Sequence, residues 1–199
     1  MGDNKPFDTG AMCGAHTERG YNQSTTSGLP FWVMDPRPED IRILDIAHHL
    51  SRITRFGGAL RADVWDYTVA QHSCLVSDNC PDGFKLEGLL HDAGEAYHGD
   101  LIKPIKMQVP DWKSMEHRVE AAIRAKFGLP PVISPEVKKE DWRAVATEHR
   151  DVQTPTTAVD WGTLAPAWPE PITPWTRERC FREFLERFTR LVQEGAACR

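Results

Sequence analysis

Apolar residues recur at intervals of three and four over most of the chain, and this spacing is the strongest constraint on its fold. Such a period places apolar side chains on one face of a helix, where a core can cover them. The clearest stripe is Trp112, Met115, Val119, Ile123 and Phe127. The same period predicts helices over 45–56, 65–79, 84–98, 111–127, 135–151 and 174–194. We therefore expect an all-α fold, with five to six helices around one core.

The ends of these helices carry recognisable signals. Asp45 stands where an N-cap would begin the first helix, and Ser134-Pro135 has the residues expected at a helix start. Gly128 follows the 111–127 stripe, and a glycine just past the last turn is a frequent helix stop.

Two regions depart from the helical pattern near the N-terminus. Residues 1–30 are rich in Gly, Ser, Thr and Asn, which predicts a flexible arm. Residues 31–43 alternate short strand-like runs with prolines, which predicts a small hairpin leading into the domain. The domain itself is expected to run from residue 31 to residue 199.

A third exception is the Pro- and Trp-rich stretch 152–173. Unstructured loops of that length are uncommon in compact domains, and many serve as lids or oligomer contacts. The simpler alternative is a surface loop pinned by Trp161 and Trp168.

The stretch LLHDAGEAYHGDLIKPIK (89–106) loads an apolar helix with groups that are costly to bury. It contains His91, Asp92, Glu95, His98 and Asp100. His91 and Glu95 are four residues apart and share a helix face, while Asp92 points about 100° around the axis. These groups could form a solvated face, a set of core hydrogen bonds, or part of a metal site.

Two other predicted helices present polar groups to the same core. His72 shares a face with Val69 and Leu75, and Asp141 shares one with Ala144 and further apolar residues. Buried charges are rare unless they are paired or bind metals. A single inward histidine is usually satisfied by ordinary hydrogen bonds, so spacing alone leaves both readings open.

Composition excludes several classes of function. The chain has 24 basic and 29 acidic residues, a net charge of −5, which disfavours binding to nucleic-acid polymers. It contains no apolar run long enough to span a membrane. Its five cysteines form no CxxC pair, which favours a reducing cytoplasm over a disulfide framework.

Three segments together resemble the HD-domain phosphohydrolase superfamily. They are VAQHS (69–73), LLHDAGEAYHGDLIKPIK (89–106) and KKEDWRAVATEHRDV (138–152). More narrowly, they are similar to the bacterial 5′-deoxynucleotidase branch and its prophage and phage relatives, which include dATP triphosphohydrolases. The resemblance extends from about residue 31 to residue 152, and it implies an HD-domain helical bundle.

The resemblance also implies roles for particular residues. His72, His91, Asp92 and Asp141 match the family's metal ligands, and Glu95 matches the acid that positions water and assists proton transfer. With Asp92, Glu95 makes up the implied catalytic pair. The implied substrate contacts are Arg55 to phosphate, Asp100 to the sugar hydroxyl, Phe56 in place of the tryptophan that lies against the sugar, and positive charge from Lys103 and Lys106.

The expected activity is hydrolysis of deoxynucleotides with one divalent transition metal (Co, Mn, Fe, Zn or Ni). Deoxynucleoside 5′-monophosphates releasing phosphate are the preferred substrates. The alternative is release of triphosphate from deoxynucleoside triphosphates, with additional Mg²⁺. A different class is a non-catalytic assembly protein with a structural metal clip. The resemblance further implies a homo-oligomer, a dimer or a hexamer, in a bacterial or phage-infected cytoplasm.

Overall fold

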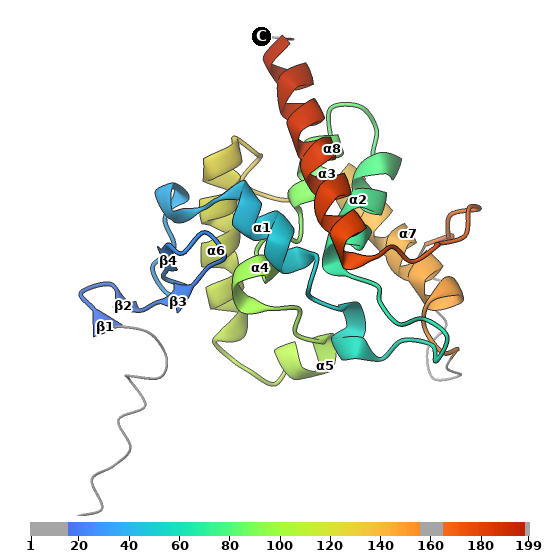
Figure 1. Cartoon of the computed structure of the whole chain (residues 1–199), viewed down its shortest axis with the longest axis horizontal. Helices are drawn as coiled ribbons and strands as arrows, with labels where there is room; N and C mark the ends of the chain where they lie inside the picture. The colour runs from blue at the N-terminus through green and yellow to red at the C-terminus, as the bar shows by residue number, and fades with distance from the viewer. Residues whose placement is uncertain (1–15, 156–164, 198–199) are drawn as a thin grey trace, which may run out of the picture.

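The protein, seen in a computed structural model that describes residues 16–155 and 165–197, is a bundle of helices (Figure 1). The α-helices are α1 (Ile43–Leu50), α2 (Val69–Asn79), α3 (Lys85–Leu90), α4 (Glu95–His98), α5 (Lys103–Lys106), α6 (Trp112–Phe127), α7 (Pro135–Asp151) and α8 (Arg177–Ala197). The strands are β1 (His16–Thr17), β2 (Gly20–Tyr21), β3 (Gln23–Ser24) and β4 (Pro30–Phe31). This confirms the predicted all-α class.

Helix α2 lies at the centre and packs against α3, α7 and α8. Nearly all of its side chains from Val69 to Ser77 are buried, and they include the polar Gln71 and His72. A helix that is buried all round must satisfy its polar groups internally. Gln71 does so through the backbone before α8, accepting from the Trp175 amide at 2.9 Å and donating to the Thr173 carbonyl at 2.8 Å.

Helix α8 crosses the bundle beside α1, α2 and α3, and its last turns extend beyond the neighbouring helices (Figure 1). Cys180 and Phe184 from α8 are fully buried in the main core. Within the described ranges, no helix combines the length and apolarity that crossing a bilayer requires.

The N-terminal region differs from the flexible arm predicted for residues 1–30. Residues 1–15 lie outside the described part, but residues 16–31 form two antiparallel hairpins, β1–β2 and β3–β4. The second hairpin is tied to the bundle, because the Gln23 side chain donates to the Tyr97 carbonyl at 2.8 Å. Contacts between the N-terminal region and the helical bundle therefore start before residue 31, where the domain was expected to begin.

The predicted capping role of Asp45 is wrong, since α1 begins at Ile43 and Asp45 is already inside it. The Asp45 carboxylate instead accepts from the Ser27 amide at 2.7 Å and from the Ser27 hydroxyl at 2.8 Å. Similarly, Ser134 precedes α7 but makes no side-chain cap, and its hydroxyl donates to Glu87. The stop at Gly128 is confirmed, with a left-handed φ of 65°.

The long 152–173 stretch is partly described. Residues 156–164, which include Trp161, lie outside the described ranges. Trp168 is 3% exposed, and its indole NH donates to Glu140 Oε2 at 2.9 Å while its amide donates to the Thr147 hydroxyl at 2.8 Å. Trp168 therefore pins the end of this stretch to α7.

Candidate metal centre

The helix predicted over 84–98 is interrupted where its polar groups lie. Helix α3 ends at Leu90, four residues of turn follow, and α4 begins at Glu95. Gly94 belongs to this turn, where an added Cβ would come within 3.0 Å of the His98 ring. The break places His91 and Asp92 beside α2 and α7 instead of continuing a regular helix.

Four side chains from three parts of the fold converge at this break. His72 Nε2 lies 3.2 Å from His91 Nε2 and 3.2 Å from Asp141 Oδ1. His91 Nε2 lies 3.6 Å from the same Asp141 oxygen. Asp92 Oδ2 lies 3.4 Å from His72 Nε2 and 3.3 Å from His91 Nε2. The ligand atoms of His72, His91 and Asp141 form a group that can hold a metal ion, and Asp92 reaches both imidazoles.

These separations suit a common cation. Divalent metals bind histidine nitrogen and carboxylate oxygen at about 2.0–2.2 Å, so adjacent ligands around one ion lie about 3.0–3.6 Å apart. All five distances fall between 3.2 and 3.6 Å. Without a cation, two imidazole nitrogens and two carboxylates would face one another at short range.

Hydrogen bonds on the outer side of each imidazole fix its tautomer. His91 Nδ1 lies 2.8 Å from the Gly88 carbonyl, which can only accept, so this nitrogen carries a proton. His72 Nδ1 lies 2.5 Å from Glu148 Oε1 and donates to that carboxylate. Both Nε2 lone pairs therefore point into the shared centre when the rings are neutral, as metal-ligating histidines require.

The cluster perturbs the pKa of every member. Burial lowers the pKa of His91, but the carboxylates of Asp92 and Asp141 outweigh it and raise that pKa well above its usual range. Burial and Arg55 oppose protonation of His72, yet Glu148 and Asp141 raise its pKa. Burial would raise the pKa of both aspartates, and the two imidazoles lower it instead.

One side of the cluster is open. The side chains of His72 and His91 are 0% and 2% exposed, whereas those of Asp92 and Asp141 are 23% and 31% exposed. The imidazoles therefore form a buried floor and the carboxylates a solvent-facing rim. Structural zinc sites are closed, whereas catalytic sites keep positions for water or substrate.

Arg55 lies beside this rim in a distorted turn. The turn is held by the next segment, where the Arg55 amide donates to the Tyr67 carbonyl at 2.9 Å. Phe56 follows with φ 58°, a left-handed conformation that bulky residues rarely adopt. The guanidinium carbon of Arg55 lies 5.1 Å from the centre of the Phe56 ring, so the ring covers one side of the cation.

The Arg55 guanidinium is buried among carboxylates. Its Nη2 lies 3.2 Å from Glu148 Oε2, and its Nη1 lies 3.6 Å from Asp92 Oδ2 and 4.0 Å from Asp100 Oδ2. Its Nε is buried and has no hydrogen-bond partner among the described residues. Asp100 thus joins the group on its Arg55 side.

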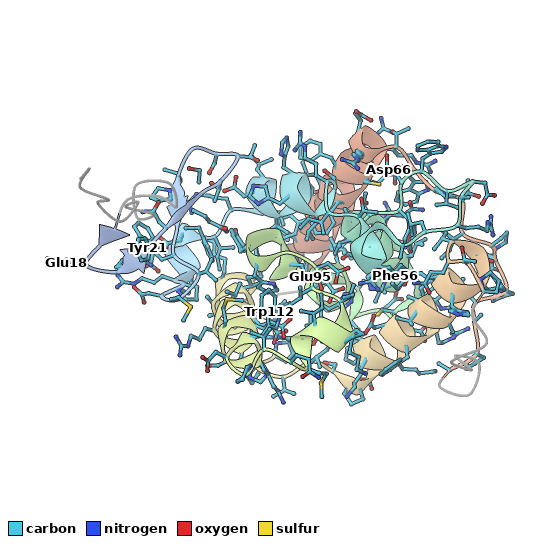
Figure 2. The ribbon with its side chains drawn as sticks, turned by 90° about the horizontal axis from the view of Figure 1, so that it is seen from below. Glu18, Tyr21, Phe56, Asp66, Glu95 and Trp112 are labelled. Carbon is cyan, nitrogen blue, oxygen red and sulfur yellow. The ribbon has the colours of Figure 1, made fainter. Side chains whose placement is uncertain are left out.

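Glu95 supplies a second orphaned atom. Its Oε1 lies 3.8 Å from Lys106 Nζ, and its Oε2 is buried without a hydrogen-bond partner in the described part. Burial first, and then the charges of Asp92 and Asp100, raise the pKa of Glu95 well above its usual range. Figure 2 shows Glu95 and Phe56 in the middle of the molecule, away from the hairpin residue Tyr21.

The two lysines and His98 have other partners. Lys106 forms a 2.7 Å ion pair with Glu116, and Lys103 Nζ lies 5.7 Å from the centre of the Trp142 ring. His98 Nδ1 donates to the Gly99 carbonyl at 3.0 Å, and the His98 ring packs edge-on against the Trp112 ring. His98 therefore turns toward α6, and the sequence had left it without a role.

A separate cavity of about 370 Å³ lies between α2 and the segment before α8, lined among others by Leu75, Ile172 and Trp175. None of the predicted metal or substrate residues lines it. The candidate site is therefore defined by converging ligand atoms and not by this cavity.

The structure adds two residues to the site. Glu148 contacts both His72 and Arg55. It lies seven residues after Asp141, on the same face of α7, and this spacing is the signal that points to it. Tyr67 donates to Glu148 Oε1 at 2.9 Å, and no sequence pattern marks it.

Fold and site together define a helical protein with an open group of histidine and aspartate ligands. No family model matches the sequence. The chain is 47% identical over 128 residues to the uncharacterized protein YfdR of Escherichia coli, covering 64% of this chain and 70% of YfdR. The chain belongs to the family of YfdR.

A second relative is the uncharacterized protein RCAP_rcc00048 of Rhodobacter capsulatus. It is 36% identical over 125 residues, which cover 59% of this chain and 63% of that protein. Neither name assigns an activity, so function has to be argued from the site.

Proposed function

We propose that the protein is a divalent-metal-dependent phosphohydrolase that releases phosphate from deoxynucleoside 5′-monophosphates, as its resemblance to HD-domain phosphohydrolases implies. The observation that carries the proposal is a pair of buried orphaned atoms, Arg55 Nε and Glu95 Oε2, beside an open metal-binding group. A buried polar atom without a partner is costly, and a ligand that completes it recovers that cost.

A phosphoryl group suits both atoms. Its oxygens accept hydrogen bonds, so they can take the Arg55 Nε–H, and arginine binds phosphate in planar, charge-assisted geometry. His72, His91, Asp92 and Asp141 would hold the metal. When bound, such an ion supplies Lewis-acid polarisation of a phosphoryl oxygen and lowers the pKa of a coordinated water.

Glu95 would act as the proton donor. Burial and the charges of Asp92 and Asp100 raise its pKa, and this direction favours protonation of the leaving 5′-oxygen over abstraction of a proton from water. Lys106 Nζ lies 3.8 Å from Glu95 Oε1, which leaves Oε2 without a partner and free to contact the substrate.

Two residues would select the sugar. The Asp100 side chain is 11% exposed and can accept a hydrogen bond from a 3′-hydroxyl. Phe56 is held over Arg55 by its left-handed backbone, and its ring would crowd a 2′-hydroxyl.

One observation favours deoxynucleoside triphosphates as alternative substrates. Lys103 makes no ion pair with a described carboxylate, and it lies over Trp142, the residue after Asp141. An ammonium over the residue that follows Asp141 could bind additional phosphates.

Incubation of the Co²⁺- or Mn²⁺-loaded protein with dAMP and, separately, dATP tests both activities. Phosphorus NMR identifies the product: inorganic phosphate from dAMP supports the proposal, and triphosphate from dATP supports the alternative. If neither nucleotide is hydrolysed, both are refuted, and a non-catalytic metal clip becomes the better account.

A further inference from the structure

Glu148 is the best-connected buried carboxylate beside the site, and its two oxygens contact different groups. Oε1 accepts from His72 Nδ1 at 2.5 Å and from the Tyr67 hydroxyl at 2.9 Å. Oε2 accepts from Arg55 Nη2 at 3.2 Å. Glu148 and Tyr67 are both 0% exposed, so water cannot replace these contacts.

The two contacts lead to different parts of the site. His72 presents Nε2 to the metal-binding group, and its ring orientation is set by the bond from Nδ1. Arg55 carries the orphaned Nε, and its guanidinium plane is set by the bond from Nη2 to Glu148. One rigid carboxylate therefore fixes the geometry of both groups.

We propose that Glu148 is a positioning residue that orients the metal ligand His72 and the anion-binding Arg55 together, so that metal affinity and phosphate affinity depend on the same side chain. The phosphate half rests on the proposed function, whereas the metal half rests only on the contacts of His72. Outer hydrogen-bond partners of metal-ligating histidines are worth about 10–100-fold in metal affinity.

Glutamine cannot replace this carboxylate. If the amide oxygen of Glu148→Gln accepts from His72, the amide NH₂ faces the Arg55 donor. If the side chain is flipped, the NH₂ faces the Nδ1–H of His72. In either orientation two hydrogen-bond donors face each other, so we expect both Co²⁺ affinity and phosphate affinity to fall. Glu148→Asp keeps two acceptor oxygens on a shorter stem and should be less impaired on both.

The test measures two equilibria by titration calorimetry: Co²⁺ binding to the metal-free protein, and inorganic phosphate binding to the Co²⁺-saturated protein. We expect Glu148→Gln to weaken Co²⁺ binding about tenfold or more and, at saturating Co²⁺, to weaken phosphate binding several-fold. Arg55→Met should weaken phosphate binding without weakening Co²⁺ binding, because it leaves the His72 contact intact.

Glu140→Gln is the matched control. Glu140 is also on α7 and is 4% exposed, but it accepts from Trp168 and Arg143 instead of the site. It should reduce thermal stability while leaving both affinities within about twofold, since it touches neither His72 nor Arg55.

The outcomes are distinguishable. Wild-type affinity of Glu148→Gln for Co²⁺, or a phosphate affinity that does not fall at saturating Co²⁺, overturns the joint role. If Glu148→Gln does not fold, Glu148→Asp decides: unchanged binding of both ligands overturns it as well. If the Co²⁺-saturated wild type does not bind phosphate at all, the proposed function fails, while the Co²⁺ titrations still test the link from Glu148 to His72.

Discussion

Metal binding should release protons from the two imidazoles, and the hydrogen bonds of the cluster set how many. The Nδ1 protons of His72 and His91 stay in place, because Glu148 and the Gly88 carbonyl accept them. Only Nε2 protons can leave. These two nitrogens are 3.2 Å apart, so the metal-free site can hold one bridging proton or two separate ones.

The magnitude follows from proton counting. Each proton displaced makes the free energy of metal binding more favourable by about 1.4 kcal/mol per pH unit, which is about tenfold in affinity. Release of one to two protons therefore predicts a ten- to hundredfold increase in metal affinity per pH unit. The gain in metal affinity persists at every pH below the raised pKa values of His72 and His91 in the folded protein, and it ends above them, where both rings are already neutral.

In the metal-free protein a rise in pH has the opposite effect, because it removes the contribution of the two histidines to folding stability. Because the pKa values of His72 and His91 are raised on folding, their contribution to stability is complete below about pH 6.5 and is lost as the pH rises through the folded values. Asp92 and Asp141 have lowered pKa values, so their contribution is present above about pH 4 and is lost on acidification.

The assay is Co²⁺ titration calorimetry between about pH 6 and 8, in buffers of different ionisation enthalpy, which counts released protons. The difference in Tm between Co²⁺-loaded and metal-free protein should widen over the same range. His98→Gln is the control and should leave the proton count unchanged, because His98 lies outside the cluster. Affinity independent of pH, with no proton released at pH 6.5, would refute the reasoning.

Three further variants test separate parts of the structure. Glu95→Gln should lower phosphomonoester hydrolysis about 10²–10⁴-fold, while Co²⁺ affinity and Tm stay near wild type; unimpaired turnover would exclude Glu95 as proton donor. Phe56→Ala should reduce the kcat/KM preference for dAMP over AMP about tenfold, and an unchanged ratio would exclude steric selection by the ring. Gly88→Ala should lower the free energy of unfolding in urea by about 1–3 kcal/mol, because its Cβ would meet Cys80 Sγ at 2.9 Å; wild-type stability would contradict that packing.

Periodicity alone predicted much of the fold and part of the site. The stripes over 65–79, 111–127 and 135–151 correspond to α2, α6 and α7, because core burial sets the same period that the sequence shows. The period placed His72 and Asp141 on the core-facing sides of their helices, and the structure brings both to His91 in the metal-binding group. Spacing alone did not decide between a metal site and ordinary core hydrogen bonds.

What the sequence could not predict depends on contacts between distant segments. Asp45 resembled an N-cap, but its carboxylate accepts a hydrogen bond from the Ser27 amide instead. No local sequence pattern connects residues 18 positions apart. The short helix α5 was not expected, because four residues carry too little periodicity. The Arg55 turn depends on pairing with the Tyr67 backbone, which helix periodicity does not encode.

The most direct test of the central claim is a crystal structure of the Co²⁺-loaded protein with anomalous scattering data. We predict one strong peak about 2.0–2.3 Å from His72 Nε2, His91 Nε2 and a carboxylate oxygen each of Asp92 and Asp141. The absence of a peak at this site under saturating Co²⁺, or a peak bound by other residues, would contradict the account.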